Sequence, residues 1–173
     1  MWFRRNSVPD DIRRALHLPR GERVLAGAPL ADGSWAVATT DELAVATESL
    51  GGRPAEILLH RPWCDVDRAS FDPERSVLTI TWVDVEPELR LYLTDPTRTT
   101  FPQVLRERVQ WSVVLAETVA LPDGREVKVA VRRMTDGGLF SQAIAGPGVD
   151  LDDPEVADVV DTAEARVRGA AGM

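Results

Sequence analysis

Residues 55–94 read AEILLHRPWCDVDRASFDPERSVLTITWVDVEPELRLYLT, and this stretch decides the fold class. Within residues 76–83, leucine, isoleucine and tryptophan alternate with threonine and valine, and in residues 88–93 three leucines alternate with charged and polar side chains. Side chains two positions apart share one face of a strand, so both segments predict half-buried antiparallel strands. The Asp-Pro-Glu-Arg sequence before the first of them is typical of a tight turn with proline at its second position.

The chain on either side of these segments follows the same pattern. Turn signals such as Asp32-Gly33 and Asp41-Glu42 separate short apolar runs that have no room between them for a crossover helix. Seven strands of an antiparallel sheet are therefore predicted, over residues 23–30, 35–40, 43–47, 56–60, 64–71, 76–83 and 88–93.

Helical spacing of apolar residues appears in three other places. A short N-terminal helix is expected to begin with Ser7 as its cap and Pro9 in its first turn, and a second helix is expected over residues 102–111. A three-stranded meander then precedes a terminal helix that begins at Asp153-Pro154 and carries an apolar stripe of valines. The chain is thus predicted to be α+β, with an arm (1–20), a domain of antiparallel strands and one helix (21–112), and a meander with its helix (113–173), packed as one globular unit.

Composition limits the classes of partner. The chain has 173 residues, with 20 lysines and arginines against 28 acidic residues, and a net charge of −8. This balance argues against binding to nucleic acid, because phosphate-rich partners require clustered cations. The single cysteine excludes an intrachain disulfide, and the N-terminus lacks the apolar run of a signal peptide, so a cytoplasmic location is expected.

Candidate chemical groups are few. His60 and Cys64 lie four positions apart across Pro62, and a Cys–His nucleophile is the enzymatic reading of this pair. A buried structural cysteine beside a histidine at the end of a strand is the favoured reading. One cysteine and two distant histidines cannot form a zinc site, and the acids of residues 150–158 suit a helix start better than a calcium loop. No catalytic, cofactor-binding or metal-binding residue is predicted.

The order of the elements resembles a pleckstrin-homology-like barrel of the bacterial or GRAM type over residues 21–112. The resemblance is carried by the SWAVATTDELAVA hairpin that ends at Ala46, by RPWCDV at residues 61–66, and by the FPQVLRERV helix at residues 101–109. It implies a closed antiparallel barrel plugged by one helix, and a binding scaffold rather than an enzyme. The loop that binds lipid headgroups in such proteins corresponds to APLADG at residues 28–33, which has no basic residue, so headgroup binding is not transferred.

The predicted function is that of a non-catalytic cytoplasmic module that binds an unidentified protein partner or acts as a scaffold. The alternative is a weak membrane-surface or small-ligand module that uses a basic, aromatic N-terminal arm. For the arm itself, packing on the acidic surface of the body is the favoured interpretation. The residues of the arm that would make surface or partner contacts are Trp2, Phe3, Arg4, Arg5, Arg13 and Arg14.

Overall fold

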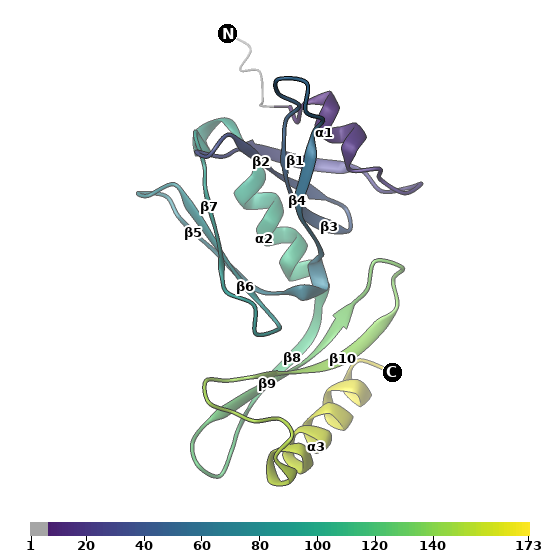
Figure 1. Ribbon diagram of the computed structural model, residues 1–173. Coiled ribbons are helices and arrows are strands. Elements are labelled where there is room, and N and C mark those ends of the chain that lie inside the picture. The colour runs from purple at the N-terminus through teal and green to yellow at the C-terminus, as the bar shows by residue number, and fades with distance from the viewer. Residues whose placement is uncertain (1–6) are drawn as a thin grey trace. The chain divides into compact units, whose positions relative to one another are not determined.

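The structure, a computed structural model, describes residues 7–173 and shows an α+β chain (Figure 1). The chain divides into two compact units, residues 1–110 (unit 1) and residues 111–173 (unit 2). Within the described residues there are three α-helices and three antiparallel sheets. The predicted α+β class and the antiparallel pairing are confirmed, but the seven strands predicted as one barrel divide between two of these sheets.

Unit 1 contains two sheets built from consecutive hairpins, with the strand orders β1-β2-β3-β4 and β5-β6-β7. The first sheet consists of β1 (Val24–Pro29), β2 (Ser34–Thr39), β3 (Glu42–Thr47) and β4 (Glu56–Pro62). The second sheet consists of β5 (Val66–Asp72), β6 (Val77–Trp82) and β7 (Leu89–Tyr92).

The core of unit 1 lies between the two sheets and one helix. Leu78, Ile80 and Trp82 of β6 are 1%, 0% and 5% exposed, and the residues between them are only half-buried, which confirms the predicted alternation. Helix α2 (Phe101–Ser112) runs beside both sheets (Figure 1) and adds Phe101 and Leu105 to the same apolar cluster.

The two sheets of unit 1 meet at two places without forming one closed barrel. On one side, an isolated bridge joins Leu30 to Leu93, and the chain then turns back at Gly33, so β1 and β7 pair over a single step. On the other side, the 3₁₀ turn η1 (Trp63–Asp65) links β4 to β5, and the indole Nε1 of Trp63 donates to the Thr39 carbonyl at 3.1 Å. The continuous barrel expected from the sequence is therefore not found among the described residues.

Helix α1 (Asp10–Ala15) packs on the outer face of the β1–β4 sheet through Val8, Ile12 and Leu16. The prediction that Ser7 caps this helix was wrong: the N-cap position is Pro9, and no side chain makes a cap hydrogen bond. The reason lies in Val8, the one residue between Ser7 and Pro9. A residue before proline is driven into extended backbone, and Val8 is buried against the sheet at 3% exposure, so the chain becomes helical only after Pro9.

Unit 2 is a meander covered on one face by the last helix (Figure 1). Its strands, in the spatial order β10-β9-β8, are β8 (Val113–Ala120), β9 (Glu126–Arg133) and β10 (Leu139–Ala145). Helix α3 (Pro154–Ala170) is capped by Asp153, whose carboxylate accepts a hydrogen bond from the Glu155 amide. The helix buries Val156, Val160 and Val167 against the strands. The apolar stripe of valines predicted for this helix is thus buried against the meander.

Candidate binding groove

An apolar groove of about 540 Å³ lies between β4 and β7 in unit 1, and we call it the β7 groove. Its floor consists of Leu30, Val45 and Leu91, which belong to the core and are 5%, 7% and 3% exposed. The volume falls within the range of roughly 300–1,000 Å³ that is typical of ligand sites.

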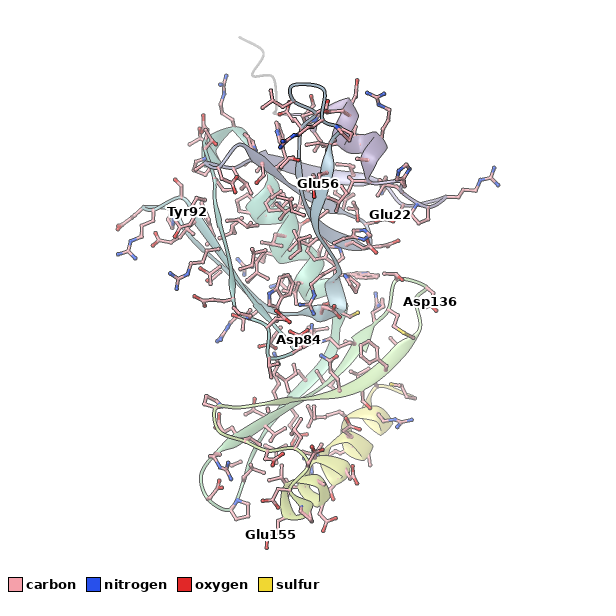
Figure 2. The ribbon with its side chains drawn as sticks, in the orientation of Figure 1. Glu22, Glu56, Asp84, Tyr92, Asp136 and Glu155 are labelled. Carbon is pink, nitrogen blue, oxygen red and sulfur yellow. The ribbon has the colours of Figure 1, made fainter. Side chains whose placement is uncertain are left out.

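Two large apolar side chains border this groove and are open to solvent. Leu58 of β4 is 54% exposed and Tyr92 of β7 is 51% exposed. Figure 2 labels Tyr92 on the β7 side of unit 1 and Glu56 at the start of β4, near the middle of the unit in this view. Single exposed apolar residues are ordinary, but these two adjoin a floor that is itself apolar, so the apolar surface of the groove continues into solvent.

A β-bulge accounts for the exposure of Leu58. Strand β4 pairs with β3 as Val45 with Leu59 and then Ala46 with Ile57, so Leu58 is an extra residue without a partner on β3. As a result, Ile57 packs on the outer cluster beside α1 and Leu59 packs on the inner core, although they are two positions apart. In the sequence, the signal for this bulge is three successive apolar residues, Ile-Leu-Leu, within the strand predicted at residues 56–60.

The outer edge of β7 is only partly covered. The Leu93 amide donates toward β6, to the Ser76 carbonyl, at 2.8 Å, whereas the Tyr92 carbonyl accepts the Ala31 amide at 2.8 Å on the opposite side. Because backbone groups alternate in direction along an antiparallel strand, the N–H and C=O of Arg90 point away from β6, as the Tyr92 carbonyl does. The chain turns back at Gly33, so β1 ends before it reaches Arg90.

The charged groups that line the groove already have partners. Asp32 accepts hydrogen bonds from the hydroxyl and the amide of Ser34, and these bonds lower the pKa of its carboxyl. Arg90 pairs with Glu88, and this pairing raises the pKa of the guanidinium. A ligand in the groove would therefore meet apolar side chains and backbone groups. The two charged side chains of the lining, Asp32 and Arg90, are already paired with Ser34 and Glu88.

The residues of the predicted contact arm fall into two sets. Trp2, Phe3, Arg4 and Arg5 lie outside the described residues. Arg13 and Arg14 lie in α1, where each donates to a backbone carbonyl of its own segment, Val8 for Arg13 and Asp10 for Arg14. The structure places neither of these arginines in the lining of the β7 groove.

The other candidates have structural explanations. His60 on β4 lies against the carboxylate of Glu42, and desolvation raises the pKa of Glu42 despite that contact. Cys64 sits in the η1 turn and is half-buried rather than buried as predicted, since the turn directs Trp63 into the core instead. Asp153 is the N-cap of α3. The acids of residues 150–158 therefore lie around the start of a helix, as the sequence predicted.

The part of the chain that the structure describes holds no group of three or more histidine, cysteine or acidic side chains suited to a metal ion. Over the same residues, no helix is both long and apolar enough to cross a lipid bilayer.

No protein-family model matches the chain, and no curated protein matches it in sequence. The β7 groove therefore has to be interpreted from its own geometry.

Proposed function

We propose that the chain is a non-catalytic binding module for a protein partner, and that the β7 groove is its binding surface. The observation that carries the proposal is the continuity of the buried apolar floor with the exposed side chains of Leu58 and Tyr92. Aromatic and aliphatic side chains beside a preformed pocket are the usual anchors of protein recognition, because burying them on association removes apolar surface from water.

The pleckstrin-homology-like arrangement is part of the same proposal. Seven antiparallel strands in two sheets, followed by a helix whose apolar face enters the core between them, support it. In this interpretation the two sheets form an incomplete barrel. They are joined at the Leu30–Leu93 bridge, which we call the seam, and at the η1 turn. A scaffold of this kind is consistent with binding, although function has to be argued from the site itself.

A photo-crosslinking experiment tests the proposed surface. A benzophenone amino acid replaces Leu58 in one variant and Val85, which is fully exposed in the β6–β7 loop, in a matched control. After irradiation in the cells from which the chain comes, we expect a discrete protein adduct from position 58 and none from position 85. The same adduct from both positions, or none from position 58, would contradict the proposal.

A second candidate function, peripheral contact with an anionic membrane, is supported by the loop between β3 and β4. Leu50 in this loop is 81% exposed, and the neighbouring Ser49 binds the Asp11 carboxylate through its amide at 2.6 Å and its hydroxyl at 2.5 Å. These bonds hold an exposed leucine close to α1, the helix that carries Arg13 and Arg14. An apolar side chain beside cations is the arrangement that binds a bilayer surface.

Co-sedimentation with vesicles of phosphatidylserine and phosphatidylcholine tests this second candidate. We expect weak binding at low salt that Leu50→Asp reduces, that Val85→Asp leaves unchanged, and that disappears near 0.15 M salt, where charges are screened beyond about 8 Å. The absence of binding at low salt would eliminate the membrane candidate without affecting the β7 groove.

A further inference from the structure

From the edge of β7, we infer that the occupant of the β7 groove is an extended peptide segment with apolar residues at alternate positions, whose backbone pairs with Arg90. This inference rests on the proposed function and specifies the chemistry of the partner. It follows from the backbone at the edge, from the direction of the floor side chains, and from the charges of the lining.

The outer edge of β7 presents the backbone groups of Arg90. The carbonyl of Tyr92 is used by Ala31 from the end of β1, and the next outward-facing pair on β7 is the N–H and C=O of Arg90. An extended chain that continues the line of β1 past its turn would lie beside this pair. It would supply one acceptor and one donor, as a strand added to a sheet edge does. An acyl chain or another hydrocarbon ligand has no group that can do so.

The side chains of such a strand would alternate between two environments. One set would point toward the floor formed by Leu30, Val45 and Leu91, where only apolar groups are in reach. The other set would point outward, past Arg90 and Tyr92, toward water. The period of two therefore predicts a motif of apolar residues at positions i and i+2, with few constraints on the residue between them.

The charges of the lining favour a neutral segment over a headgroup or a nucleotide. Asp32 is held by Ser34 and Arg90 by Glu88, and each of these contacts stabilises the ionised form. An anionic ligand would have to displace Glu88 from Arg90, and a cationic ligand would have to displace Ser34 from Asp32. A peptide with apolar side chains at the floor displaces neither.

The experiment begins with selection of eight-residue peptides displayed on phage, using the full chain as bait and the Leu58→Asp variant for counter-selection. We expect enriched peptides to share the apolar i, i+2 motif. The best of them is then synthesised in versions that each carry one N-methylated amide. Methylation at the amide that faces Arg90 should weaken binding on the order of tenfold or more, because it removes a hydrogen bond and blocks the edge, whereas methylation of the neighbouring amides should change it little.

Two substitutions in the protein provide the matched test. Arg90→Pro removes the outward N–H, and it leaves the ladder with β6 intact because that ladder does not use the Arg90 amide. Arg90→Ala removes only the side chain. We expect Arg90→Pro to weaken peptide binding on the order of tenfold more than Arg90→Ala does, with both variants checked for an unchanged melting temperature.

The possible results separate this inference from the proposed function. Peptides whose binding is equally tolerant of N-methylation at every amide would overturn strand pairing, while a crosslink at Leu58 would still support protein binding. If no peptide is enriched and oleate binds in a Leu58-dependent manner instead, the strand inference is wrong. Absence of both the crosslink and the peptides would refute the proposed function as well.

Discussion

Replacing Gly27 with alanine tests how α1 is docked on the sheet. Gly27 lies in β1, and a methyl group added to it would overlap Cγ2 of Val8, the residue that anchors the start of α1. Gly27 has no positive φ, so the backbone itself would accept alanine, and crowding by Val8 is the only cost. The substitution and its partner Val8→Ala should therefore be strongly coupled.

The magnitudes follow from the packing. Overfilling a well-packed site costs about 1–3 kcal/mol, so Gly27→Ala alone should lower the free energy of unfolding by that amount. Val8 is 3% exposed, and Val8→Ala should cost about 2 kcal/mol for the lost methyl groups and the cavity they leave. In the double variant, the new methyl group enters the space that Val8 has left, so the total should be less than the sum by about 1–2 kcal/mol.

Urea unfolding followed by tryptophan fluorescence measures all four members of this cycle. Gly169→Ala in α3 is the control, because a methyl group there meets no atom within 4 Å, and alanine in a helix should stabilise by about 0.5–1 kcal/mol. Additive losses for Gly27 and Val8, within about 0.5 kcal/mol, would refute the proposed packing of α1.

Three further expectations follow from burial and charge. Ile80→Asp should unfold unit 1 because it places a charge in the core, whereas Thr79→Asp on the other face should cost far less; equal losses in thermal melts would contradict the alternation. Truncation before Asp153 should lower the melting temperature clearly, because it exposes the apolar face of the meander, and an unchanged melt would show that α3 is dispensable. Hydrogen bonds from Ser49 lower the pKa of Asp11 in the folded chain, so their stabilisation is present above the unfolded pKa of about 3.9 and is lost as the pH falls through the folded value. Asp11→Asn should accordingly reduce the loss of stability between pH 7 and pH 3, and an identical pH dependence in both proteins would rule out this contribution.

Much of the fold could be predicted because its signals are local. The alternation in β6 and the valine stripe of α3 each lie within a few turns or strand residues, and the structure confirms both. The β7 groove could not be predicted in the same way. It depends on the pairing register between β3 and β4, which exposes Leu58, and on where β1 ends relative to Arg90, and both relations join residues far apart in the chain.

The candidate site shows the same limit. Composition drew attention to the arginines and aromatic residues near the N-terminus, because clustered cations can be recognised without any knowledge of pairing. The apolar lining of the groove comes from four separate segments, around Leu30, Val45, Leu58 and Leu91, none of which is unusual on its own. The Ile-Leu-Leu run in β4 is the local trace of the bulge that exposes Leu58.

The seam between Leu30 and Leu93 also has a consequence for the order of folding. The hairpins of unit 1 close short loops, whereas this bridge closes a loop of roughly 60 residues, whose entropic cost is met only after the hairpins have formed. We therefore expect the seam to be the last pairing made on the folding route and the first to open in the native state. Amide exchange at Ala31 and Thr94, which donate across it, should then be faster than exchange within β6. During synthesis, the β7 groove could therefore not form until the ribosome had released the residues around Thr94.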